Sequence, residues 1–181
     1  NYRLAPRHAW PVQLEDCQAA LRWLCDHADE WQVDKRRLGA WGYSAGAQLS
    51  LMLAMHPTSG SDSIRAVVAG GAPCDLTTLA EDNRMLVGFL GGTRGQVPER
   101  YRDASPIAFV REGNVPLFFF HGTQDFIVPY QNARKIYEEA LEKSIETEFY
   151  DVAEAGHLWA FVDSEARQRA IAFLKKHLTE H

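Results

Sequence analysis

Three side chains that can together carry out nucleophilic catalysis occur in this sequence in the order Ser44, Asp125 and His157. A serine hydroxyl is a poor nucleophile until a neutral imidazole removes its proton, and an acceptor on the other ring nitrogen must orient the imidazole. We therefore expect Ser44 to attack, His157 to transfer the proton and Asp125 to orient His157. Because His157 must be neutral to act as a base, activity is expected to fall on acidification.

Ser44 lies at the centre of residues 42–46, which read Gly-Tyr-Ser-Ala-Gly and form a G-x-S-x-G motif. Residues 37–41 before it can form a short buried strand, and residues 45–55 have the composition of an apolar helix. The motif requires such a strand, turn and helix, and a side chain at either glycine is expected to crowd the turn. The backbone N–H of Ala45, at the start of the helix, is the expected oxyanion donor.

Asp125 and His157 are each expected directly beyond a strand. Apolar residues 115–120 predict a strand buried on both faces, and alternation over residues 146–152 predicts another. In parallel sheets, ligands bind beyond the carboxyl ends of the strands. We therefore expect Ser44, Asp125 and His157 to meet at one edge of the sheet.

Four other titratable side chains compete with this assignment or lie near it. Asp151 and Glu154 are alternative acids, but their positions, on the last strand and in the loop after it, favour Asp125. His121 is expected to stabilise the end of a strand. His56 is expected near a helix C-terminus, where its positive charge is favourable.

Alternating helices and strands organise the rest of the chain. We expect an α/β fold, a three-layer α/β/α sandwich around a mainly parallel sheet, in a single domain over residues 1–181. The first helix is expected to pack on the sheet, and Ser164 is the expected N-cap of the last. The remaining predicted elements are helices at 14–29, 131–142 and 164–178, a strand at 64–70 and a loop at 58–63.

Residues 71–110 break this alternation. Apolar residues at 85–90 predict a short helix that ends at a pair of glycines, and residues 98–101 can begin another. Two interpretations remain open, a connecting segment with its own small core and a cap insertion that walls a substrate pocket. Phe89 and Leu90 are candidate pocket residues under the second.

Composition excludes several classes of function. The chain of 181 residues has a formal net charge of −5, which argues against electrostatic binding to nucleic acid. It contains no apolar run of the roughly 20 residues that span a bilayer. Its three cysteines match no zinc or redox pattern, so we expect reduced thiols, a cytoplasmic setting and no metal or organic cofactor.

Short segments that extend over nearly the whole chain form a recognisable set. They are Y-R-L-A-P at 2–6, L-E-D at 14–16, G-Y-S-A-G at 42–46, A-S-P at 104–106, H-G-T-x-D-x-x-V-P at 121–129 and G-H at 156–157. The set resembles the α/β-hydrolase esterases of the hormone-sensitive-lipase-like group. The resemblance implies a carboxylic-ester hydrolase that acts on small acyl or aryl esters through an acyl-enzyme, with Ser44, Asp125 and His157 as its triad.

One departure from that group concerns the start of the chain. Members carry several strands and an H-G-G loop before Y-R-L-A-P, and the loop supplies further oxyanion donors. We therefore expect the sequence to be the C-terminal portion of the domain and weakly active alone, since loss of one donor typically costs about 100- to 1,000-fold. A missing strand would leave residues 38–41 as an exposed edge, at which the chain could self-associate.

Alternative functions use the same residues. A serine peptidase of the prolyl-oligopeptidase type or an amide-cleaving formamidase would share the triad, and a non-catalytic ligand-binding homologue or inactive fragment would share the fold. Further pocket candidates are Tyr43, Trp159 and Phe161. Covalent labelling of Ser44 and comparison of ester with amide substrates would discriminate these functions.

Overall fold

Four parallel strands form the centre of the computed structural model, which describes residues 1–56 and 64–179. They pair in the order β1-β2-β3-β4, so each strand lies beside its neighbours in the sequence. The predicted strands are confirmed within one or two residues at their ends, whereas the loop expected at 58–63 lies outside the described residues. The strands are β1 (Leu38–Tyr43), β2 (Ile64–Gly70), β3 (Leu117–Gly122) and β4 (Thr147–Val152).

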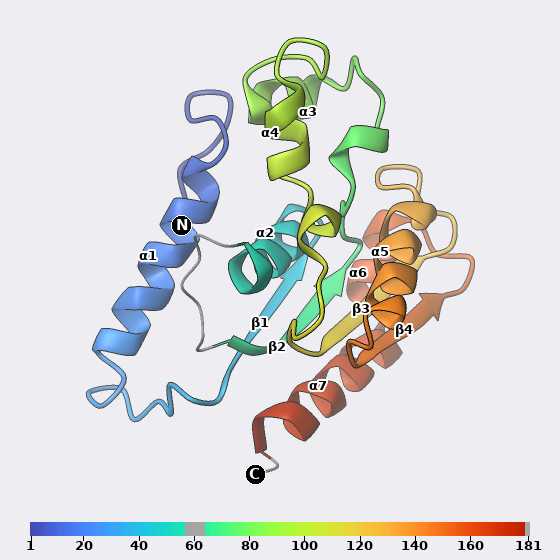
Figure 1. The fold of residues 1–181 in the computed structure, drawn as a ribbon. Coiled ribbons are helices and arrows are strands. Elements are labelled where there is room, and N and C mark those ends of the chain that lie inside the picture. Colours follow the sequence, from blue (N-terminus) through green and yellow to red (C-terminus); the bar gives the residue numbers. More distant parts are fainter. Residues whose placement is uncertain (57–63, 180–181) are drawn as a thin grey trace.

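Helices cover both faces of this sheet (Figure 1). On one face α2 (Ala45–Met55) and α5 (Tyr130–Glu142) pack on Val67, Ala69, Leu117 and Phe119. On the other, α6 (His157–Val162) and α7 (Ser164–Thr179) pack on Ala66, Val68, Phe118 and Phe120. Successive strand residues point to opposite faces, so continuous apolar runs supply both cores. The predicted three-layer α/β/α architecture is confirmed.

A third apolar cluster lies beside the sheet rather than on it. There α1 (Val12–Asp26) packs chiefly on α2, and its Leu21 packs against the core cluster on the sheet, so the prediction that this helix packs on the sheet holds only in part. The cluster also includes residues from the segment 71–110. That segment contains short helices η1 (Leu76–Thr78), α3 (Arg84–Leu90), α4 (Pro98–Asp103) and η2 (Pro106–Phe109).

Side chains and glycine define the ends of two helices. The Asn83 side chain accepts hydrogen bonds from the first turn of α3, and Gly91 ends that helix at a φ of 78°. At the last helix, Asp163 Oδ1 accepts from Ala166 N at 2.7 Å. Asp163 therefore caps α7, and the prediction of Ser164 in that role is wrong. The sequence reasoning also missed the short helix α6.

One edge of the described sheet is β1, as expected for residues 38–41. Its only partner strand in the described chain is β2, and Trp41 is 43% exposed. Across residues 1–56 and 64–179, no helix has the length and apolar character needed to cross a membrane.

The turn from β1 into α2 depends on one of its two glycines. Ser44 adopts a φ of 55°, which is strained for a residue with a side chain. A Cβ atom at Gly42 would lie 2.1 Å from Gly46 O, whereas a Cβ at Gly46 would have nothing within 4 Å. The expectation that a side chain at either glycine crowds the turn is therefore right for Gly42 and wrong for Gly46.

This difference gives a matched pair of variants. Gly42→Ala should lower the free energy of unfolding by about 1–3 kcal/mol, because backbone must move to admit the methyl group. Gly46→Ala should raise it by up to about 1 kcal/mol, because alanine has a higher helix propensity than glycine and its methyl group meets no other atom. Urea unfolding followed by circular dichroism measures both. Equal destabilisation by the two substitutions would contradict this account of the turn.

Candidate active site

Ser44 occupies the sharp turn between β1 and α2, at the carboxyl edge of the sheet. Its backbone N–H donates to Gly70 O at 2.8 Å, which ties the turn to the end of β2. The N–H groups of Ala47 and Gln48 donate to Ser44 O. Neither Ala45 N–H nor Gly46 N–H, in the first turn of α2, has an acceptor in the described chain, so both can face an anion.

Asp125 lies in the loop after β3 and is almost completely buried, with 6% of its surface exposed. Its Oδ1 accepts from the backbone N–H groups of Ile127 and Val128, both at 2.9 Å. Its Oδ2 accepts from His157 Nδ1 at 2.6 Å. One oxygen therefore fixes the loop and the other is left to orient the imidazole.

His157 begins α6, directly after the loop that follows β4. The Tyr43 hydroxyl donates to His157 O, and the two rings lie 5.0 Å apart between centroids. The ring also passes close to Gly71, where a Cβ would lie 3.1 Å from His157 Cε1. No hydrogen bond joins Ser44 Oγ to His157 in the described chain; such bonds often tighten only when substrate binds.

Tyr43, predicted as a pocket residue, therefore supports the histidine instead. Burial raises the pKa of its phenol, with a further contribution from the negative charge of Asp125. The hydroxyl consequently stays protonated and keeps its hydrogen bond to His157 O. Phe161 packs on the same ring at 4.9 Å between centroids.

His121, expected only at the end of a strand, also contacts the acid, and the sequence reasoning missed this contact. It is fully buried at the end of β3, with Nε2 2.9 Å from Val128 O and 3.2 Å from Asp125 Oδ2. Val128 O can only accept, so His121 Nε2 carries the proton. Burial lowers the pKa of His121, which makes it a neutral donor beside the acid. The four-residue spacing from Asp125 was the available signal, but it required knowing how the loop folds back.

The alternative acids point elsewhere. Asp151 accepts a hydrogen bond from the Tyr130 hydroxyl at the surface. Glu154 is exposed, and its backbone N–H donates to Thr123 Oγ1. His56, beyond the C-terminus of α2, is paired with Asp103 at 3.2 Å. The structure thus brings Asp125, and neither alternative acid, into contact with His157.

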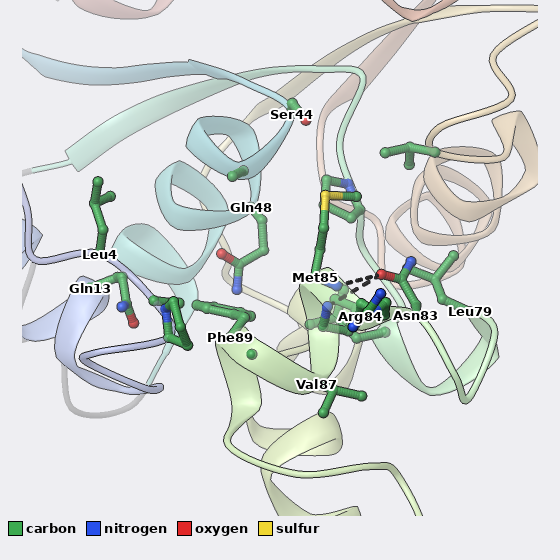
Figure 2. A pocket seen from close by; sticks show the side chains of 18 of the residues that line it. Leu4, Gln13, Ser44, Gln48, Leu79, Asn83, Arg84, Met85, Val87 and Phe89 are labelled. Carbon is green, nitrogen blue, oxygen red and sulfur yellow. Dashed lines mark hydrogen bonds between the residues drawn. The ribbon is translucent and has the colours of Figure 1, made fainter.

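A cavity of about 880 Å³ opens from Ser44 and Ala45 along α2 (Figure 2). The first residues of the chain, α2, α3 and the Asp125 loop form its walls, which are mostly apolar. Of the five predicted pocket residues, the structure places only Phe89 in this lining. Leu90 is fully buried in the core behind α3, while Trp159 and Phe161 are 75% and 58% exposed on α6.

The described residues contain no cluster of three or more histidine, cysteine, aspartate or glutamate side chains that could hold a metal ion. Cys17, Cys25 and Cys74 form no disulfide in the part of the chain that the structure describes. Cys74 is fully buried, and this burial raises the pKa of its thiol. Of the three predicted catalytic residues, Ser44 lines the cavity, whereas Asp125 and His157 contact each other outside its lining.

Substitution of His121 tests its structural contribution. His121→Leu leaves Val128 O without its donor and should cost about 1–3 kcal/mol of unfolding free energy. His121→Gln can keep an N–H at a similar position and should cost less. Thermal or urea unfolding of the two variants measures this difference, and equal losses would contradict a role for the Nε2 hydrogen bond.

The lowered pKa of His121 also predicts a pH dependence. Below the ordinary histidine range the unfolded chain binds a proton at this position that the native chain excludes, so native stability falls as pH falls. The stability of the unaltered chain relative to His121→Gln should therefore decline between pH 7 and pH 5, by at most about 1.4 kcal/mol per pH unit. A difference independent of pH would show that His121 titrates alike in both states.

Comparisons with known proteins identify relatives over most of the chain. Esterase LipC of Mycobacterium tuberculosis is 29% identical over 90% of this chain and 45% of its own length. The probable carboxylic ester hydrolase LipM of the same organism is 29% identical over 80% of this chain and 37% of its own length. The chain thus spans less than half the length of these two relatives.

Solved structures agree with the fold. A truncated carbohydrate esterase from gut microbiota superposes with a TM-score of 0.90 and 21% identity, over 99% of this chain and 73% of that one. The apo form of Thermogutta terrifontis esterase 2 gives a TM-score of 0.78 and 25% identity, over 97% of this chain and 68% of that one. These likenesses confirm the expected α/β-hydrolase fold, of which the chain forms a part.

The match to a family model covers the G-x-S-x-G turn, the cavity walls and the Asp125 loop. It extends over residues 1–140, more than three quarters of the sequence. By this match the chain belongs to the BD-FAE family.

Proposed function

We propose that this chain carries the nucleophile, base and acid of a carboxylic-ester hydrolase. The observation that carries the proposal is the 2.6 Å hydrogen bond from His157 Nδ1 to the buried Asp125 carboxylate, at the same sheet edge as the strained Ser44 turn. The esterases among the relatives support ester bonds as the target. The residue roles, the cap over residues 71–110 and the substrate are parts of this proposal.

In the proposed reaction, Ser44, His157 and Asp125 act as nucleophile, base and acid. His157 Nε2 takes the proton from Ser44 Oγ as this oxygen bonds to the ester carbonyl carbon, and the carbonyl oxygen becomes an oxyanion. Ala45 N–H and the N-terminal end of α2 stabilise that negative charge. The alkoxide then leaves with the proton from His157, which gives an acyl-serine and an alcohol.

Hydrolysis of the acyl-serine reverses these roles. His157 removes a proton from water as the water oxygen attacks the acyl carbon, and then returns a proton to Ser44 Oγ. Asp125 remains ionised and stabilises the imidazolium at each stage. Each cycle consumes one ester and one water, releases one acid and one alcohol, and uses no cofactor.

A second candidate function rests on one relative. The chain is 30% identical to the uncharacterized peptidase YtmA of Bacillus subtilis, over 75% of this chain and 53% of that protein. A triad of this kind also cleaves amides, where the leaving nitrogen must be protonated by the histidine. Esters are favoured because LipC and LipM, which match larger shares of this chain, are named as an esterase and a probable carboxylic ester hydrolase.

Covalent labelling tests the nucleophile independently of turnover. A fluorophosphonate should add once to the unaltered chain, at Ser44, and intact mass with peptide mapping measures the adduct. Ser44→Ala should take no label, and His157→Gln should react at least about 100-fold more slowly because the base is lost. The control is Ser50→Ala, a serine of α2 that follows Leu49 and is not part of the cavity lining. It should label like the unaltered chain. Labelling of Ser44→Ala at the original rate would refute the assignment.

Paired substrates test the bond that is cleaved. Hydrolysis of p-nitrophenyl acetate should exceed that of an aminoacyl p-nitroanilide, and rates for both should fall on acidification because a histidine acts as a base only in its neutral form. Release of p-nitrophenol or p-nitroaniline measures each rate. Faster cleavage of the anilide would favour the peptidase, and an unchanged rate from pH 8 to pH 5 would count against His157 as the base.

A further inference from the structure

A polar side chain faces the cavity one helical turn beyond the proposed nucleophile. Gln48 follows Ser44 by four residues in α2, so both lie on one side of the helix. It lines the same cavity and is only 3% exposed. In Figure 2 its side chain extends from α2 into the space bordered by Phe89 and Met85. A substrate arm that enters the cavity from Ser44 therefore passes this amide.

A hydrogen bond determines the orientation of the Gln48 side-chain amide. Gln48 Nε2 donates to Ala104 O at 2.7 Å. Because a carbonyl oxygen only accepts, the NH2 group must face Ala104 and Oε1 must occupy the other position. In the described chain no donor bonds to Oε1. Gln48 thus presents a rigidly held acceptor that lacks a protein partner.

The cavity that Gln48 lines is mostly apolar. Leu49, Leu76 and Phe89 are among its lining residues and cannot donate a hydrogen bond from their side chains, and the polar members besides Ser44 and Gln48 are Tyr2, Gln13, Asn83 and Arg84. A buried acceptor that loses water without gaining a donor is costly, so a wholly hydrocarbon substrate arm would be disfavoured there. A few fixed polar groups in an apolar pocket commonly set specificity.

We infer that Gln48 is a specificity-determining residue whose Oε1 accepts a hydrogen bond from a hydroxyl or N–H group of the substrate. The inference rests on the proposed ester hydrolysis at Ser44. It names the substrate class as esters in which the arm that fills the cavity carries a hydrogen-bond donor about one helical turn, ~6 Å along α2, from the ester carbonyl. The donor could reside on the acyl or the alcohol side of the ester.

Pairs of substrates of equal size isolate the hydrogen bond. For the acyl side, p-nitrophenyl 5-hydroxypentanoate is compared with hexanoate, and 4-hydroxyphenylacetate with 4-methylphenylacetate, because these hydroxyls can reach about one helical turn from the carbonyl. For the alcohol side, 2-hydroxyethyl acetate is compared with propyl acetate. The ratio of kcat/KM, hydroxylated over methyl, should be about tenfold higher in the unaltered chain than in Gln48→Met for at least one pair. The pair affected tells which side of the ester enters the cavity.

The ratio separates specificity from structural support. If Gln48 only anchors Ala104, Gln48→Met lowers kcat/KM for both members of a pair and leaves each ratio unchanged, which would overturn the inference. Leu49→Met is the matched control, because it places the same side chain in the adjacent wall without altering the amide. Its ratios should equal those of the unaltered chain.

Binding to Ser44→Ala provides a test without turnover. Calorimetry with the intact esters should give a Kd about tenfold lower for the hydroxylated member of the affected pair while Gln48 is present. Equal or weaker binding of all hydroxylated members would overturn the inference even if Gln48→Met failed to fold. Failure of the unaltered chain to hydrolyse any ester would instead count against the proposed function, and the Kd comparison would still decide the role of Gln48.

Discussion

The carboxyl end of β2 is the point on which the site depends. Gly70 O accepts the N–H of Ser44 at 2.8 Å, and Gly71 N donates to Phe120 O at 2.9 Å, so this end joins the serine turn to β3. Gly71 has a φ of 54°, and a Cβ there would lie 2.8 Å from the ring of Tyr43 and 3.1 Å from His157. The absence of a side chain at one position thus lets the turn, the tyrosine and the histidine approach one another.

The acid is held more firmly than a single hydrogen bond would allow. Both oxygens of Asp125 are engaged, Oδ1 by two backbone N–H groups and Oδ2 by His157, with His121 Nε2 nearby. Since His121 is kept neutral by burial, it adds a donor without adding a charge that would compete with an imidazolium on His157. Preorganisation of this kind is what stabilises developing charge at low cost during a reaction.

Local sequence patterns predicted the strands and helices that position the site. The residues that line the cavity, in contrast, depend on tertiary contacts. Strands and helices were predictable because apolar runs and turn residues encode them within a few positions, and this alone brought Ser44, Asp125 and His157 to one edge. Leu90 and Trp159 were misplaced because the face that a short helix buries depends on neighbours that sequence spacing does not specify. The same limit explains why the contact between His121 and Asp125, across a folded loop, was missed.

The orientation of Gln48 shows the same dependence on tertiary contacts. The four-residue interval from Ser44 was visible in the sequence, but the orientation of the Gln48 amide depends on Ala104, 56 residues away.

The cavity walls differ in how closely they are tied to the serine. The first residues of the chain are held by Arg3, whose guanidinium pairs with Asp16 at 2.6 Å and lowers the pKa of that carboxyl to about 2. Arg3 is half exposed, and exposed ion pairs contribute little to stability because water screens them. The wall formed by α2 is instead continuous with the backbone of Ser44 and buried against the core. A group on α2 therefore keeps its distance from the reacting carbonyl when other walls adjust, which is why Gln48, rather than the N-terminal segment, is suited to select the substrate.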